Sequence, residues 1–148
     1  MMKHLIPVGV VCLVGCATLG PAFVEEPAPN SREALIYVYR INDEFGSLVP
    51  TQIIVNGVEI SKLPNNAYTF ARVPAGIVTL FATRFEDFNY SEKRRVVLED
   101  NVTGGETYFL KVWTKQASAF SIVTTVKVEY PDQGRKDLQH LRLSKPKQ

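Results

Sequence analysis

The alternation of apolar and polar residues from position 34 onward constrains the fold of this chain more than any other feature. The alternating stretches are rich in Val, Ile, Thr, Tyr and Phe, which suit the pleated, half-buried surface of a β-strand. They predict strands at residues 34–41, 52–56, 67–72, 77–84, 95–99, 107–114 and 122–130. Turn-forming residues separate them, as at Asn56-Gly57 and Pro74-Ala75-Gly76. Short strands joined by such turns predict an all-β fold, a single antiparallel β-sandwich of about seven strands.

The periodicity also predicts which side chains face the core. Tyr108, Leu110 and Val112 share one face of their strand and are expected to be buried. In the last strand, the alternate residues that begin at Ile122 and end at Tyr130 are expected to point inward for the same reason.

A short helix is expected over residues 132–141, after the last strand. Asp132 is placed as its N-cap, and Leu138 and Leu141 have the spacing that turns both toward the sheet. Gly134 weighs against this helix, because glycine is a poor helix former.

Upstream of these strands, residues 1–15 have the organisation of an export signal. Lys3 supplies a positive start, residues 5–14 are apolar, and the small Gly15 precedes Cys16. The apolar stretch is about half as long as the roughly 20 residues that a membrane-spanning helix needs. The run Leu13-Val14-Gly15-Cys16 resembles the lipobox of bacterial lipoproteins.

That resemblance implies cleavage before Cys16, with a diacylglycerol on its thiol and a further acyl chain on its amine. Several acyl chains on one residue make membrane anchoring stable without a spanning segment. In proteins that resemble this one, a residue other than Asp after the cysteine, here Ala17, implies the inner leaflet of the outer membrane, facing the periplasm. The alternative is an ordinary secretory leader cut near Ala17, which would leave the protein without an anchor.

The cysteine content agrees with a lipid attachment site. The chain has two cysteines, and Cys12 lies within the leader that would be removed. A mature chain with Cys16 alone cannot form an internal disulfide, although an exported protein enters a compartment that permits one.

The remaining sequence divides into three parts. Residues 16–33 contain Pro21, Pro27 and Pro29 without regular hydrophobic spacing, and are expected to form a lipidated flexible tether that holds the domain roughly 20 Å from the lipid. Residues 34–142 are expected to form the β-sandwich domain, and residues 143–148 a basic tail.

Charge argues against nucleic-acid binding. The chain has 17 basic and 15 acidic residues, and removal of the leader takes away one of the basic residues, Lys3. Binding to phosphate backbones requires a broad basic surface, which a nearly balanced chain does not provide. At the carboxyl end, Arg142, Lys145 and Lys147 are expected to contact anionic lipid headgroups weakly.

The inventory of reactive side chains is poor for an enzyme. His140 is the only histidine beyond the leader, and Cys16 is assigned to the lipid. We therefore expect no catalytic residues, no metal site, and no cofactor apart from the lipid on Cys16.

Two sets of residues are candidates for binding. Phe85, Phe88 and Tyr90 alternate with acidic residues in one loop, a composition typical of partner docking, and Trp113 is expected on the solvated face of its strand. The phenylalanines of that loop have an equally good interpretation as plugs for the open end of the sandwich.

The second set predicts a ligand pocket between the sheets. Its lining residues are expected to be Tyr68, Tyr108 and Arg40.

The body is similar to a family of bacterial lipoproteins catalogued as domain of unknown function 2846, whose members combine a lipobox with one small β domain. The stretches that carry the resemblance are Ala34-Leu35-Ile36-Tyr37-Val38-Tyr39-Arg40, Val55-Asn56-Gly57, Asn66-Ala67-Tyr68, Val73-Pro74-Ala75-Gly76 and Gly105-Glu106-Thr107-Tyr108-Phe109. The turns also resemble those of PEGA and carboxypeptidase-regulatory β-sandwich modules, which implies binding or scaffolding.

These observations predict a non-enzymatic lipoprotein of the bacterial cell envelope that presents a binding or scaffolding surface to an envelope protein partner. The alternative is a periplasmic lipoprotein that binds a small ligand in a pocket between its sheets.

Overall fold

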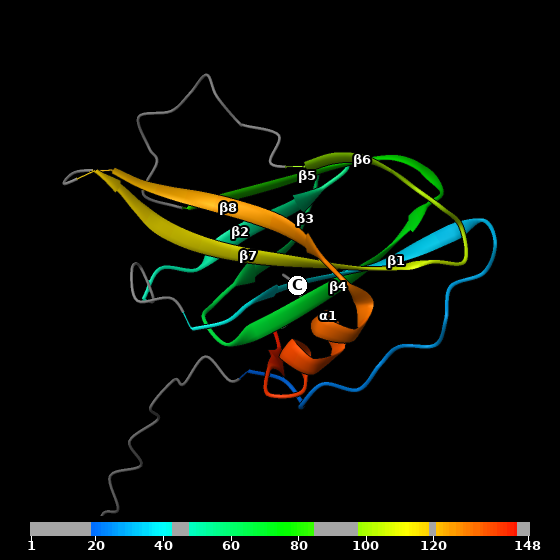
Figure 1. Cartoon of the computed structure of the whole chain (residues 1–148), viewed down its shortest axis with the longest axis horizontal. Helices are drawn as coiled ribbons and strands as arrows, with labels where there is room; N and C mark the ends of the chain where they lie inside the picture. Colours follow the sequence, from blue (N-terminus) through cyan, green and yellow to red (C-terminus); the bar gives the residue numbers. More distant parts are fainter. Residues whose placement is uncertain (1–18, 43–47, 85–97, 119–120, 145–148) are drawn as a thin grey trace, which may run out of the picture.

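Two β-sheets pack face to face, and one short helix covers the outer side of the larger sheet (Figure 1). The computed structural model describes residues 19–42, 48–84, 98–118 and 121–144. The arrangement confirms the all-β sandwich with a short C-terminal helix that the alternating pattern predicts.

The larger sheet has the strand order β8-β7-β1-β4-β9. Its strands are β1 (Glu33–Arg40), β4 (Ala67–Pro74), β7 (Thr107–Ser118), β8 (Ser121–Glu129) and β9 (Arg142–Leu143). The pairs β1/β4 and β7/β8 are antiparallel, whereas β1/β7 and β4/β9 are parallel. β1 is therefore the central strand of a mixed sheet.

The smaller sheet has the strand order β3-β2-β5-β6 and is antiparallel throughout. Its strands are β2 (Thr51–Val55), β3 (Val58–Leu63), β5 (Gly76–Arg84) and β6 (Leu98–Val102). The link between β2 and β3 is a two-residue turn in which Asn56 and Gly57 both have positive φ, at 48° and 82°. This is the geometry of a type I′ hairpin, which asparagine and glycine adopt readily.

Three strands differ from the sequence prediction. The sequence prediction contains no strand at β3 or β9. β3 begins directly after the Asn56-Gly57 turn, and β9 has only two residues. β6 begins at Leu98, so it overlaps the predicted strand 95–99 only at its end. Residues 85–97 lie outside the part that the structure describes.

A first hydrophobic cluster fills the space between the two sheets. It draws alternate residues from β1 and from the strands that face it, and its members are Ala34, Ile36, Val38, Ile53, Val55, Leu63, Ala67, Val73, Val78, Leu80, Ala82, Val102, Leu110 and Val112. Leu110 and Val112 are buried as predicted, while Tyr108 is only partly buried against the cluster.

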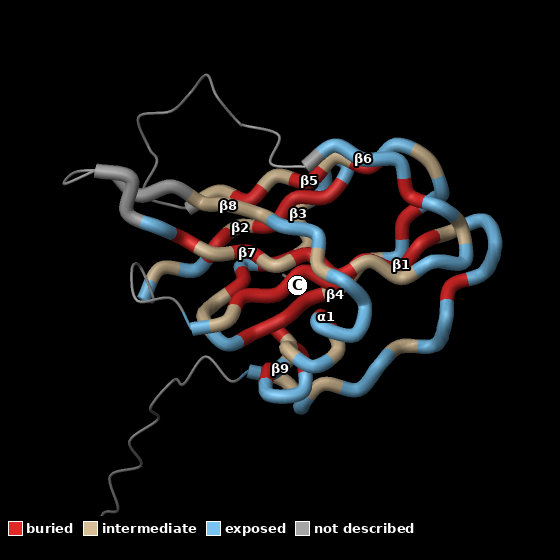
Figure 2. The backbone as a smooth tube through the Cα atoms, viewed as in Figure 1, coloured by how far each residue is buried: buried red, intermediate tan, exposed pale blue. Residues whose placement is uncertain are grey.

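A second cluster lies on the opposite face of the larger sheet, beneath α1 (Pro131–Leu138). It consists of Leu35, Tyr37, Tyr39, Tyr68, Phe109, Leu138 and Leu141. Residues 34–40 of β1 are all buried, because one face of that strand packs into each cluster. In Figure 2 the buried residues follow the strands, and the outward side of α1 is exposed.

The start of α1 differs in detail from the sequence prediction. Tyr130, not Asp132, occupies the N-cap position, and its side chain makes no capping hydrogen bond. Asp132 lies in the first turn, where its carboxylate suits the positive end of the helix dipole. Leu138 and Leu141 are both buried against the sheet as predicted, although Leu141 follows the end of the helix.

The inward face predicted for the last strand is correct only in part. Val126 packs against the cluster between the sheets, but Val128 is 42% exposed and Tyr130 is 82% exposed. β8 is an edge strand of the larger sheet, and Val128 and Tyr130, unlike Val126, do not join the cluster between the sheets.

Gly134 permits the close approach of α1 to the sheet. A Cβ atom on Gly134 would overlap the side chain of Phe109. The glycine that weakens the helix in isolation is therefore the residue that lets the helix pack on β7.

We expect Gly134→Ala to destabilise the fold. Alanine gains up to about 1 kcal/mol in helix propensity, but overpacking against Phe109 costs roughly 1–3 kcal/mol. Urea unfolding should show a net loss of about 1 kcal/mol. The exposed Lys136→Ala on the same helix is the control and should change the stability little. A Gly134→Ala protein as stable as the parent would show that the helix does not depend on this contact.

Candidate functional site

The three residues predicted to line a ligand pocket do not lie together. Arg40 pairs in register with Ala67, which belongs to the cluster between the sheets, whereas Tyr68 belongs to the cluster on the opposite face. Tyr108 pairs with Ile36, four residues and about 13 Å along β1 from Arg40. The structure therefore corrects the prediction that Tyr68, Tyr108 and Arg40 share a pocket.

Two of these residues make contacts that hold the fold together. The Arg40 side chain is fully buried and donates from Nη1 to the carbonyl oxygen of Val49 at 2.8 Å. The Tyr108 hydroxyl accepts a hydrogen bond from the backbone N–H of Thr103 at 2.9 Å, beside the turn that precedes β7. Both side chains thus secure loops at the sheet ends.

Trp113 is the one predicted partner-binding residue that the structure describes. It lies on β7, in register with Thr125 of β8, and is partly buried. It shares the outer face of the sheet with Phe109 and Lys111, because alternate residues of a strand point the same way. Phe85, Phe88 and Tyr90, and the lipid-attachment residue Cys16, lie outside the described residues.

Residues 19–30, here called the strap, pack against the larger sheet. The backbone N–H of Gly20 donates to Leu143 at 2.7 Å, and that of Leu143 donates to Pro21 at 3.0 Å. Ala22 forms an antiparallel bridge with Arg142. The strap therefore extends the sheet beyond β9, which corrects the prediction of a flexible tether over residues 16–33 for all but its first few residues.

Aromatic contacts anchor the middle of the strap. The ring of Phe23 meets Tyr37 and Tyr68 edge-on, with ring centroids 5.5 Å and 5.3 Å apart. The Tyr37 hydroxyl accepts a hydrogen bond from the backbone N–H of Glu26 at 2.7 Å. Burial raises the pKa of Tyr37 and of Tyr68 above the ordinary value for tyrosine. Tyr37 thus supports the strap through both its ring and its hydroxyl.

Charged side chains secure the strap at two further points. Arg135 of α1 pairs with Glu25 at 2.9 Å, and its guanidinium lies 5.4 Å from the centre of the Phe109 ring. Arg72 of β4 donates to the carbonyl oxygen of Pro27 at 2.6 Å. A sequence pattern of prolines without periodicity does not reveal these contacts, because all of the partners lie far along the chain.

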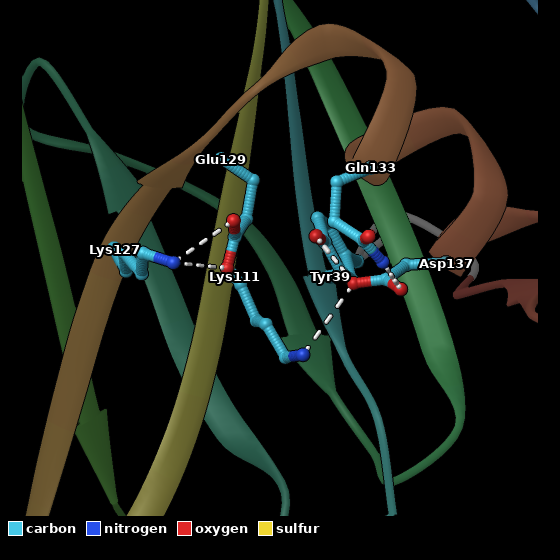
Figure 3. Close-up of polar contacts among 6 residues, drawn as sticks. All are labelled: Tyr39, Lys111, Lys127, Glu129, Gln133 and Asp137. Atoms are coloured by element: carbon cyan, nitrogen blue, oxygen red, sulfur yellow. Dashed lines mark hydrogen bonds and ion pairs between the residues drawn. The ribbon is translucent and has the colours of Figure 1, made fainter.

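Asp137 joins α1 to the sheet (Figure 3). Its Oδ2 accepts a hydrogen bond from the Tyr39 hydroxyl at 2.9 Å and lies 3.4 Å from Lys111 Nζ, while its Oδ1 accepts one from Gln133 at 2.6 Å. Burial, and then the bond to Asp137, raise the pKa of Tyr39 well above its ordinary value. Beside this group, Lys127 pairs with Glu129 at 3.0 Å. The carboxylate of Asp137 is thus engaged by three donors.

Within residues 19–42, 48–84, 98–118 and 121–144, no three His, Cys, Asp or Glu side chains are grouped as metal ligands. In the same part of the chain, no helix is long and apolar enough to cross a membrane.

Comparisons with family models, with curated proteins and with solved structures find no match for this chain. The resemblance to a lipoprotein family of unknown function stays a prediction from the sequence stretches that carry it.

Replacement of the strap's aromatic anchor should loosen the strap. We expect Phe23→Ala to cost about 2 kcal/mol, less than the roughly 3–5 kcal/mol of a core phenylalanine, because the ring between Tyr37 and Tyr68 is only partly buried. Hydrogen exchange should accelerate at the backbone amides of Glu26 and Leu143. The exposed Val24→Ala is the matched control, and unchanged exchange in Phe23→Ala would contradict this role.

The raised pKa of Tyr39 predicts alkaline sensitivity. Above about pH 10 the unfolded chain loses the Tyr39 proton, whereas the folded protein retains it. Tyr39 therefore leaves the free energy of unfolding unchanged below about pH 10 and lowers it as the pH rises further. In Tyr39→Phe the decline should be shallower by about 1.4 kcal/mol per pH unit. Urea titrations from pH 9 to pH 11 measure both slopes, and equal slopes would contradict the prediction.

Proposed function

We propose that this chain is a lipid-anchored, non-enzymatic lipoprotein of the bacterial cell envelope, held by Cys16 in the inner leaflet of the outer membrane and facing the periplasm. The observation that carries the proposal is the run Leu13-Val14-Gly15-Cys16 after a short apolar leader, followed almost at once by a folded domain. Several acyl chains on Cys16, such as palmitate, make membrane anchoring stable without a spanning segment.

The short link between anchor and domain supports a role at the membrane surface. Only four residue steps separate Cys16 from Gly20, which is the first of the described residues with a backbone hydrogen bond to β9. That length of chain spans at most about 14 Å. The sandwich is therefore carried against the bilayer, as suits a scaffold or binding module.

The use of polar side chains supports a non-enzymatic role. Asp137 serves to join α1 to the sheet, and Arg40 supports the chain at Val49. His140 is exposed, just past the end of α1. Asp137 and Arg40 have structural partners and His140 is exposed, whereas general acid–base catalysis requires such groups to converge on one reacting atom.

The outer edge of β8 is the surface that best suits a protein partner. Among the described residues, no strand pairs with this edge. Unpaired strand edges accept an added strand from a partner through backbone hydrogen bonds. Val128, on the inner face, and Tyr130 are exposed near its end, and Trp113 is partly exposed on the outer face of the adjacent strand. Exposed apolar side chains on both faces of an open edge favour docking of an extended peptide segment.

The anchor is tested by substitution of Cys16. In cells, Cys16→Ser should abolish incorporation of labelled palmitate and shift the protein out of the floating membrane fraction, because the thiol that receives the diacylglycerol is lost. Cys12→Ser is the matched control, since it changes the other cysteine of the leader region and should leave both readouts intact. Acylation of the Cys16→Ser protein, or turnover of a substrate by the purified domain, would overturn the proposal.

A further inference from the structure

We propose that one edge of the larger sheet, here called the basal edge and formed by residues 19–22 and β9, lies on the bilayer and binds anionic lipid headgroups. The orientation part of this inference rests on the proposed anchoring at Cys16. The headgroup contact is a property of the edge itself and can be tested without the anchor.

Chain connectivity places the basal edge next to the lipid. The strap enters the fold alongside β9, with Gly20 hydrogen-bonded to Leu143 and Ala22 bridged to Arg142. The link of at most about 14 Å from Cys16 is shorter than the width of the sheet, because four strand spacings, about 19 Å, separate β9 from β8. An acylated Cys16 therefore holds the β9 side of the sheet nearer to the membrane than the β8 side.

Charge segregation gives the basal edge an affinity for anionic lipid. Residues 16–24 carry no charge, and residues 138–148 contain three cations, Arg142, Lys145 and Lys147, without any acidic residue. The mature chain as a whole is nearly balanced, with 15 acidic residues against 16 basic ones. This acid-free segment therefore holds three of the 16 basic residues, and among them Arg142 has a described position, on the basal edge.

The side-chain directions at this edge suit contact with an interface. Arg142 is exposed, whereas its neighbour Leu143 packs against the cluster beneath α1, as expected for alternate residues of a strand. Leu19, at the start of the strap, is 38% exposed. Each basic residue near an anionic surface contributes about a fivefold gain in binding. Leu19 and Arg142 are therefore two exposed side chains, one apolar and one cationic, on the same edge, a combination that membrane-surface segments use.

The headgroup contact is tested on the mature chain, residues 16–148, with Cys16→Ser to remove acylation. Both sheets, both clusters and the strap lie within this length. In low salt, the protein should sediment with phosphatidylglycerol vesicles more than with phosphatidylcholine vesicles. Arg142→Gln should weaken the binding about fivefold, whereas Lys115→Gln, which removes an exposed cation from β7, should weaken it less than twofold. Equal effects of the two substitutions, or no preference for the anionic vesicles, would overturn the headgroup contact.

The orientation is tested on the acylated protein in vesicles that contain a nickel-chelating lipid. Spin labels are placed at Arg142→Cys on the basal edge and at Lys127→Cys on β8, since acylation occupies Cys16. The label at position 142 should relax several-fold faster than the label at position 127. Equal or reversed rates would overturn the orientation. A failure of acylation would instead appear as the absence of palmitate at Cys16, and it would overturn the proposed function. The measurement on the unacylated chain would still decide the headgroup contact.

Discussion

The burial of β1 on both faces is the constraint on which the rest of the structure depends. One face carries Ile36 and Val38 into the core between the sheets, and the other carries Tyr37 and Tyr39 beneath α1. A strand of this kind needs cover on both sides, so a two-layer sandwich alone would leave an aromatic face in water. The helix and the strap cover this aromatic face. The composition of β1 thus explains why the larger sheet needs a further layer.

The tyrosine hydroxyls determine how that cover is attached. A buried hydroxyl must find a hydrogen-bond partner, and Tyr37 and Tyr39 find theirs in the strap and in α1 respectively. Phenylalanine at these positions would fill the same volume without specifying where the strap and the helix lie. The tyrosines of β1 thus supply buried apolar area, and their hydroxyls fix where the strap and α1 pack.

The sequence predicts the local part of this architecture and misses the long-range part. Period-two alternation located most strands within a few residues, and the spacing of Leu138 and Leu141 identified the side of the C-terminal segment that packs on the sheet. The strap was missed because its partners, such as Arg135 and Leu143, are more than a hundred residues away.

The candidate pocket failed for a related reason. Residue types alone do not say that Tyr68 and Arg40 point to opposite faces of one sheet. That follows only from the register between β1 and β4, which sets each residue of one strand opposite a particular residue of the other. A docked strap also bears on the proposed anchor. A flexible coil would let an anchored sandwich reorient, whereas a packed strap would couple an acylated Cys16 to the edge at β9. In the proposed orientation, the same aromatic contacts that cover β1 would also turn the β8 edge away from the bilayer.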